Sequence, residues 1–318
     1  MLIINREQVE ALLDMDRLIA ALAPAMAELS AGRVSMPQRV AAQVAGKGLL
    51  GVMPAYLSAT RTLACKLVSV FPQNSSLGLP THQAVVMLFD AETGEPKAML
   101  DGASITALRT AAGSALATKL LARPDADVLL IIGTGVQART HVHAVPRVRK
   151  IKELRVAGRD AGRTATFADE LSDRLGLKAK AYAIGPDAFA GAHIVCATTH
   201  AEEPVVQGAW LEPGMHINSV GLNQRGQELD VETLQRARLF VESRAAALAP
   251  PPSGANELQG AGVQAEIGEL VAGARPGRTE PGQITLYKSV GVAVQDAVAA
   301  QLVYDAALRE SAGLEVNL

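Results

Sequence analysis

Residues 128–138, VLLIIGTGVQA, join a run of β-branched and other apolar residues to the glycine motif G-x-G-x-x-A. An apolar run that ends at once in glycines is typical of a strand that turns tightly into a helix. Gly133 permits the turn, Gly135 lets the backbone approach a pyrophosphate, and Ala138 keeps the helix close to the strand. Free N–H groups at the start of the helix can bind the anion. The stretch therefore predicts a dinucleotide-binding α/β fold.

The next predicted strand, residues 152–158, has Leu154 and Val156 in alternation and is followed by Arg159. An acidic residue at this point accepts a hydrogen bond from the ribose 2′-hydroxyl of NAD, whereas an arginine suits the 2′-phosphate of NADP. Asp160 lies one position late for the first role, and a solvated loop residue is the alternative for Arg159. The residues favour NADP(H) over NAD(H).

The composition indicates a globular protein with two domains. The 318 residues are 49% hydrophobic and 19% charged, and the formal net charge is −2. A chain of this length is too long for one ordinary core. Because the sequence has no cluster of basic residues, we do not expect the protein to bind nucleic acid or an anionic membrane. We expect neither a membrane span nor an N-terminal signal peptide.

Cysteine and histidine usage favours a cytoplasmic protein without a metal site. Cys65 and Cys196 both lie in apolar, strand-like runs, where two buried free thiols are expected rather than a disulfide. The six histidines show none of the spacings of metal-binding motifs. His141 and His143 lie two apart on a predicted helix and therefore face different sides.

Strands and helices alternate after residue 127, which predicts a parallel sheet covered by helices. We expect a Rossmann-type dinucleotide-binding domain over residues 121–292. Residues 1–120 and 293–318 are expected to form an α+β domain for substrate binding and dimerisation.

Caps and turn residues predict the elements of the first domain and one helix and one loop of the second. They are helices capped by Asn5, Asp16 and Ser104, strands at 48–53, 63–71 and 83–89, a hairpin turn at 90–94, a helix at 137–148, and a stiff proline-rich loop at 245–260.

Three cationic residues are conspicuous in the apolar first domain: Arg39, Lys66 and Arg109. Lys66 lies inside the strand-like run 63–68, where desolvation of an unpaired ammonium costs several kcal/mol. Arg109 lies in an Ala-rich helix and is followed by small residues. Together the three would bind a carboxylate, the arginines in bidentate geometry. The alternatives are a snorkelling lysine, a surface arginine on the helix, and a loop charge.

Several short motifs follow one another along nearly the whole chain. They are Met36–Arg39, Lys66 with Phe71–Asn74, Thr81–Gln83, Thr106–Ala112, Gly133–Ala138, Ile217–Gly221 with Glu228–Asp230, and Lys288–Gly291 with Gln295 and Asp296. In these motifs the chain resembles the ornithine cyclodeaminase/μ-crystallin family. That family includes ornithine and lysine cyclodeaminases, an archaeal type of alanine dehydrogenase, and reductases of ketimines and other imino acids.

The resemblance implies an NAD(P)-dependent homodimer whose N-terminal domains pair through their sheets. It assigns Arg39, Lys66 and Arg109 to the substrate carboxylate. It assigns Val136 and Gln137 to the cofactor phosphates. The cofactor-binding residues expected from the motif and the resemblance are Thr81, Arg109, Thr110, Gly133, Gly135, Val136, Gln137, Ala138, Arg159, Thr198, Thr199, Val220, Gly221, Asn223 and Ser289.

One position departs from the cyclodeaminases. Where they carry an aspartate credited with acid–base chemistry, this chain has Asn223. An amide cannot accept a proton from an ammonium at neutral pH. Residues 224–227 also lack the cyclodeaminase-like Pro-Gly-Lys. The sequence therefore favours a reductase of 2-imino acids, reversible as an amino-acid dehydrogenase, over ornithine cyclodeamination or alanine dehydrogenation.

In the expected reaction, a hydride passes from NAD(P)H to the imine carbon of a small imino acid held by its carboxylate. Lys66 is the candidate proton donor and Asp296 a weaker one. The predicted catalytic residues are Lys66, Arg109, Asn223 and Asp296. From another class, the alternative is a protein that binds NADPH, with or without a small hormone-like ligand, and does not turn over.

Overall fold

The computed structural model describes residues 1–223, 226–251 and 253–317. Our sequence inferences for residues 224–225, and for Pro252 in the proline-rich loop, lie outside this part of the chain. The chain divides into two compact units. Unit 1 comprises residues 1–109 and 291–318, and unit 2 comprises residues 110–290.

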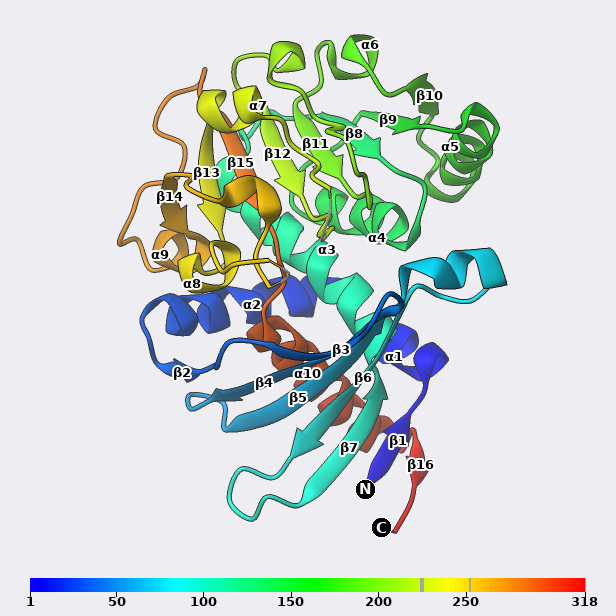
Figure 1. The fold of residues 1–318 in the computed structure, drawn as a ribbon, viewed down its shortest axis with the longest axis vertical. Helices are drawn as coiled ribbons and strands as arrows, with labels where there is room; N and C mark the ends of the chain where they lie inside the picture. The colour runs from blue at the N-terminus through cyan, green and yellow to red at the C-terminus, as the bar shows by residue number, and fades with distance from the viewer. Residues whose placement is uncertain (224–225, 252, 318) are drawn as a thin grey trace. The chain divides into compact units, whose positions relative to one another are not determined.

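Unit 1 is built on a mixed β-sheet (Figure 1). Its strands lie in the order β16-β1-β7-β6-β5-β4-β2, and β3 also pairs with β4. β1 is parallel to β7, and the other pairs are antiparallel. The strands are β1 (Leu2–Ile4), β2 (Val34–Ser35), β3 (Val40–Val44), β4 (Gly48–Leu57), β5 (Thr62–Val70), β6 (His82–Phe89), β7 (Pro96–Asp101) and β16 (Leu314–Glu315).

Helices cover one face of this sheet. α2 (Met15–Ser30) packs against α10 (Ala293–Glu310), and α10 contacts β4, β5 and β6. Alternate residues of the strands, such as Ala55, Ala64 and Val68, are buried on this face. The residues between them point to the other face and are half-buried or exposed. The sheet therefore has one covered apolar face and one apolar face that stays accessible in a single chain.

Polar side chains cap the first two helices, and one of the two predicted cap residues is correct. Asn5 caps α1 (Arg6–Leu12) as predicted, within a capping box. The predicted cap at Asp16 is wrong, because Oδ1 of Asp14 accepts from the backbone N–H of Arg17 at 2.8 Å. Asp16 lies in the first turn of α2, where its charge complements the helix dipole.

Two other predicted helix boundaries also change. The long helix α3 (Gly102–Leu121) begins before the predicted cap Ser104, whose N–H donates to Oδ1 of Asp101 at 2.7 Å. The helix predicted over residues 137–148 ends at Ala144 and continues as a single 3₁₀ turn, because a proline at its second position cannot extend the α-helix. The predicted hairpin between β6 and β7 is confirmed.

Unit 2 is a parallel sheet in the order β10-β9-β8-β11-β12-β15-β13-β14. This confirms the predicted Rossmann-type α/β fold. Its strands are β8 (Val128–Ile132), β9 (Glu153–Gly158), β10 (Ala179–Ala183), β11 (Ile194–Ala197), β12 (His216–Ser219), β13 (Ala237–Val241), β14 (Val263–Glu266) and β15 (Ile284–Lys288). Its helices after α3 are α4 (Val136–Ala144), α5 (Ala161–Leu175), α6 (Pro186–Phe189), α7 (Val231–Arg236), α8 (Arg244–Ala247) and α9 (Ile267–Val271).

The strand order reverses at β8. From β8 the chain leads to β9 on one side of the sheet, and after β10 it returns to β11 on the other side. Such a switch point leaves a crevice at the carboxyl ends of the two strands, where ligands of open α/β sheets bind. Gly133 follows β8 and Thr198 follows β11, so both lie at this place.

Two expectations about burial and loops are refined. Both thiols are free, but Cys65 is only half-buried, whereas Cys196 is buried. The expected loop at 245–260 contains the short helix α8 and a 3₁₀ turn at Asn256–Leu258. Within the described residues, no helix combines the length and the apolar character needed to cross a bilayer.

Candidate functional site

The glycine turn is tightly packed on one side and open on the other. Gly133 has a φ of +114°, which side chains rarely tolerate, and its N–H donates to the Ala157 carbonyl at 2.8 Å. A Cβ at Gly133 would lie 2.9 Å from Oγ1 of Thr198. A Cβ at Gly135 would meet no atom within 4 Å. Close approach of an anion to the backbone needs this open space.

The start of α4 fits a pyrophosphate. Gly135 is its N-cap residue, no side chain caps the helix, and its first turn carries no acidic residue. The N–H groups and the positive end of the helix dipole therefore favour an anion. Oε1 of Gln137 is buried without a hydrogen-bond partner in the part of the chain that the structure describes. The polar groups of a ligand would satisfy that amide. Val136 is 66% exposed beside it.

Arg159 and Asp160 differ in what their side chains do. Oδ1 of Asp160 accepts from the Arg163 N–H at 2.8 Å and caps α5. Its carboxylate is therefore engaged at the start of that helix. Arg159, directly after β9, is exposed. Both residues are exposed, but only the Asp160 carboxylate is engaged as a helix cap.

Asn223 joins two loops. Its Nδ2 donates to the carbonyl oxygens of His200 at 3.3 Å and Ala201 at 3.2 Å. Its own backbone carbonyl accepts from Nδ2 of Asn256 at 2.9 Å. These contacts need a donor at position 223, because a carboxylate there would face two carbonyl oxygens. The side chain holds the loop after β12 to the loop after β11.

In unit 1 two of the three predicted cations bind a buried aspartate at the start of α10. Nζ of Lys66 lies 2.8 Å from Oδ2 of Asp296, and Nε of Arg109 donates to Oδ1 of Asp296 at 2.9 Å. Nη1 of Arg109 also donates to Oε1 of Gln295 at 3.0 Å. The side chains of Lys66, Arg109 and Asp296 are 3%, 6% and 2% exposed, so this network is almost dry.

Arg39 reaches the same group of residues through the backbone of Gly291. Nη2 of Arg39 donates to the Gly291 carbonyl at 2.6 Å. Gly291 has a φ of +71°, and a Cβ there would lie 2.7 Å from Nη1 of Arg109. Four residues far apart in the sequence therefore lie together in unit 1. We call Arg39, Lys66, Arg109 and Asp296 the cation cluster.

The environment shifts the pKa values within the cation cluster. Burial lowers the pKa of Lys66 to about 8, with further lowering by Arg109 and Arg39, although Asp296 opposes this. Burial alone would raise the pKa of Asp296, but the charges of Arg109 and Lys66 outweigh it and hold that pKa below its usual value. At neutral pH Asp296 is a carboxylate and Lys66 is mostly protonated. Of the two candidate donors, Lys66 is the one with a proton to give.

Three further residues predicted to bind the cofactor are already partly engaged or buried within the protein. The Thr81 carbonyl accepts from the Phe71 N–H at 2.9 Å, and Thr110 is buried on α3. The Ser289 hydroxyl donates to Oε1 of Glu242 at 2.5 Å, so this hydroxyl is already used by the protein. Sequence reasoning missed Gln295 and Glu228 as site residues. The only signal for them was their presence in the short motifs.

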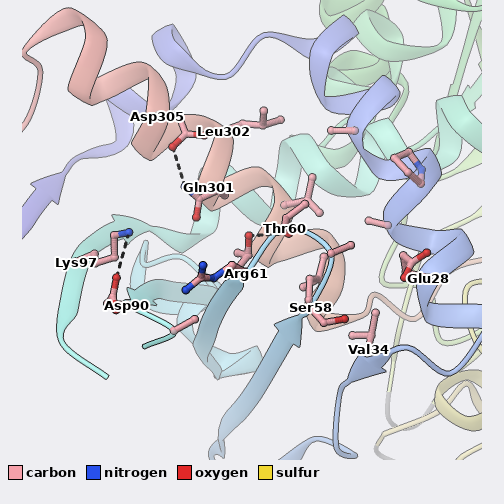
Figure 2. Close-up of a pocket in the computed structure, with 18 of the residues that line it drawn as sticks. Glu28, Val34, Ser58, Thr60, Arg61, Asp90, Lys97, Gln301, Leu302 and Asp305 are labelled. Atoms are coloured by element: carbon pink, nitrogen blue, oxygen red, sulfur yellow. Dashed lines mark hydrogen bonds and ion pairs between the residues drawn. The ribbon is translucent and has the colours of Figure 1, made fainter. Parts of the chain in front are cut away.

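A large cavity in unit 1 does not coincide with the cation cluster. It has a volume of about 560 Å³ and lies between α2, α10 and the turns after β4 and β6. Figure 2 shows Arg61, Asp90, Lys97 and Asp305 around it. Lys97 pairs with Asp90, and Arg61 pairs with Glu92, which also lines the cavity. None of the lining residues belongs to the cation cluster.

The parallel sheet and its glycine turn define a Rossmann-type α/β protein. The chain belongs to the ornithine cyclodeaminase/mu-crystallin family, whose sequence profile matches residues 1–311. It is 42% identical over 293 residues to the ketimine reductase mu-crystallin of Mus musculus, and the match covers 91% of each protein.

Solved structures of relatives agree with this family assignment. One is the Δ1-pyrroline-2-carboxylate reductase of Thermococcus litoralis in complex with NADH and L-proline. It has 38% identity, a TM-score of 0.94, and coverage of 99% of this chain and 100% of that one. Another is an archaeal alanine dehydrogenase dimer with bound NAD. It has 34% identity, a TM-score of 0.89, and coverage of 100% and 99%.

Proposed function

We propose that this protein is an NAD(P)H-dependent reductase of 2-imino acids, cyclic or N-substituted, that also works in reverse as an amino-acid dehydrogenase. The observation that carries the proposal is the cation cluster. Two cationic side chains, Lys66 and Arg109, bind the Asp296 carboxylate there, and a third, Arg39, binds the backbone carbonyl of Gly291. The names of the relatives, a ketimine reductase and a pyrroline-2-carboxylate reductase, support the same substrate class.

The cation cluster suits a ligand with one carboxylate. Asp296 neutralises only one of the two positive charges of Lys66 and Arg109. The excess positive charge lies in a poorly solvated place, where an incoming carboxylate is bound strongly. A substrate fixed by its carboxylate presents the adjacent imine carbon in a defined orientation, which lowers the barrier by several kcal/mol.

Lys66 is the proposed proton donor. Its Nζ is held by Asp296 at 2.8 Å, and a pKa of about 8 lies close to neutral pH, where a general acid works best. Protonation of the imine nitrogen by Nζ makes the neighbouring carbon a better hydride acceptor. Asp296 stays ionised and orients both Lys66 and Arg109. The nicotinamide supplies the hydride when it is bound.

NADP(H) is the proposed cofactor, favoured over NAD(H). Gly133, Gly135 and the start of α4 would hold the pyrophosphate, and exposed Arg159 would bind the 2′-phosphate. The engagement of Asp160 as a helix cap supports this choice, because its carboxylate is used elsewhere. Thr198, Thr199, Val220 and Gly221 would form the nicotinamide end of the same site.

Ornithine cyclodeamination is not favoured. The Asn223 amide donates to two backbone carbonyls and offers no base for an ammonium. No contact of the described residues favours a non-catalytic role over the reductase, so the reductase is the single function proposed.

A cofactor-oxidation screen tests the proposal. Imino acids are generated from 2-oxo acids with ammonia, methylamine or cyclic precursors, and each is offered with NADPH and with NADH. We expect oxidation with at least one cyclic or N-substituted imino acid, faster with NADPH. Binding of NADPH without oxidation by any of them would favour a non-catalytic binding protein. Formation of proline and ammonia from ornithine would overturn the assignment against cyclodeamination.

We also propose that two copies pair through the accessible face of the unit 1 sheet. Val40, Val44 and Leu50 on that face are 64%, 42% and 45% exposed, and half-buried apolar residues surround them. Leu50→Glu should convert a dimer into a monomer in analytical ultracentrifugation. A monomeric wild-type protein would refute the pairing.

We further propose a cytoplasmic location, which the two free thiols favour.

A further inference from the structure

A buried carboxylate in unit 2 ties together two loops at the carboxyl edge of the sheet. Glu228 lies between β12 and α7 and is 2% exposed. Its Oε1 accepts from the N–H of Thr199 at 2.7 Å and from the hydroxyl of Thr199 at 2.8 Å. Its Oε2 accepts from the Ser219 hydroxyl and from the Gly221 N–H, both at 2.7 Å. One side chain therefore joins the segment after β11 to the segment after β12.

A buried lysine at the end of β15 completes this arrangement. Nζ of Lys288 donates to Oγ of Ser219 at 3.0 Å and to the Gly221 carbonyl at 2.6 Å. It also lies 2.8 Å from Oε1 of Glu257 and 3.9 Å from Oε2 of Glu228. Gly221 is thus held through both its N–H and its carbonyl. Hydrogen bonds to charged groups in such dry surroundings are strong and directional.

The packing at Gly221 leaves little freedom for these loops. A Cβ there would lie 2.3 Å from the Thr199 carbonyl oxygen and 2.4 Å from Cδ of Glu228. The neighbouring Thr198 donates through its hydroxyl to the Ile132 carbonyl at 2.8 Å, directly before the glycine turn. The segments joined by Glu228 therefore lie beside the pyrophosphate end of the proposed cofactor site and share its sheet edge.

We propose that Glu228 is a positioning residue for the nicotinamide end of the cofactor site. The inference rests on the proposed function, which assigns Thr199 and Gly221 to that end. Glu228 does not touch the cofactor in this proposal. It fixes the loops that do, and Lys288 holds the same segment through Ser219 and the Gly221 carbonyl. This role accounts for the short motif Glu228–Asp230, which neither the cation cluster nor the glycine turn includes.

Glu228→Gln tests the role with little change in shape. A glutamine has one acceptor oxygen and one NH₂ group, so the NH₂ must face either the Thr199 donors or the Ser219 and Gly221 donors. We expect the affinity for NADPH, measured by fluorescence titration, to fall about tenfold, the equivalent of one charge-assisted hydrogen bond. The affinity for 2′,5′-ADP, which has only the adenosine end, should not change.

Hydrogen exchange gives a readout that does not depend on turnover. At least one of the Thr199 and Gly221 amides, whichever faces the new NH₂ group, should exchange faster in Glu228→Gln. The Gly133 amide, bonded to the Ala157 carbonyl, should keep its protection. Glu203→Gln, an exposed glutamate between β11 and β12, is the matched control and should behave as wild type. Equal loss of NADPH and 2′,5′-ADP binding would indicate a general structural role and overturn the proposal, as would unchanged NADPH binding.

A second variant keeps the test valid if Glu228→Gln does not fold. Ser219→Ala removes one of the four donors to Glu228 and leaves both backbone ties intact. A smaller but selective loss of NADPH affinity is expected, and no loss would contradict the proposal. The proposed function would be refuted if the wild-type protein bound NADPH but reduced no imino acid. The binding measurements would still test the role of Glu228 in that case.

Discussion

Replacement of Asp296 by asparagine should move the alkaline limb of the reduction reaction to lower pH. In the wild type, the general acid Lys66 has a pKa of about 8, so kcat/KM for an imino acid should fall as the pH rises through about 8. Asp296 is the group that raises the Lys66 pKa against burial and against the charges of Arg109 and Arg39. An asparagine keeps the shape but removes the charge.

The size of the shift follows from the contact that is lost. Nζ of Lys66 lies 2.8 Å from Oδ2 of Asp296 inside a nearly dry network. A hydrogen bond to a charged group contributes about 1.5–3 kcal/mol, and one pKa unit corresponds to about 1.4 kcal/mol. The limb should therefore move down by about one to two pH units, which makes kcat/KM about tenfold lower near pH 7.5.

The assay is the initial rate of NADPH oxidation from about pH 6 to pH 9, with circular dichroism at each pH to verify folding. Asp305→Asn is the control, because Asp305 is an exposed aspartate on the same helix α10. It should leave the profile unchanged. If folded Asp296→Asn retained a limb near pH 8, neither the coupling of Asp296 to Lys66 nor the role of Lys66 as the acid would stand.

Three further substitutions test other parts of the proposed site. Lys66→Met removes the proton donor and one carboxylate ligand, so kcat/KM should fall by about 100-fold or more on every imino acid, and full activity on any of them would refute the role. Arg159→Ala should weaken NADPH about tenfold and leave NADH unchanged in binding titrations, because only NADPH has a 2′-phosphate; an equal effect on both would exclude a contact to that phosphate. Asn223→Asp should lower the melting temperature, since a carboxylate would face the His200 and Ala201 carbonyls, and it should not create ornithine cyclodeamination.

Local sequence was sufficient wherever the signal lies within one element. The apolar run 128–132 and the glycines after it predicted β8, the turn and the start of α4, because strand propensity and the positive φ of Gly133 are encoded within a few residues. The cap at Asn5 was predictable for the same reason. The cap of α2 was not, because Asp14 and Asp16 are equivalent by type and only the backbone geometry selects between them.

Charge in an apolar context was also readable from the sequence. Lys66 and Arg109 could be singled out because a charge in an apolar strand or helix needs a partner. The identity of that partner was not readable. Asp296 is 187 positions from Arg109 and meets it only when the first turn of α10 packs within unit 1. The sequence offered Asp296 as a weak proton donor, whereas its surroundings hold it as a carboxylate.

The sequence by itself therefore determined the Rossmann-type fold, the place of the glycine turn and the residue types of the site, since periodicity and local backbone preferences specify these. Only the tertiary structure decided how the polar groups are partnered. It made Asp296 the anchor of Lys66 and Arg109, made Asn223 a donor to backbone carbonyls, and made Glu228 the link between two loops. Which polar groups become hydrogen-bond partners depends on which strands and helices pack together, and local propensity does not specify this packing.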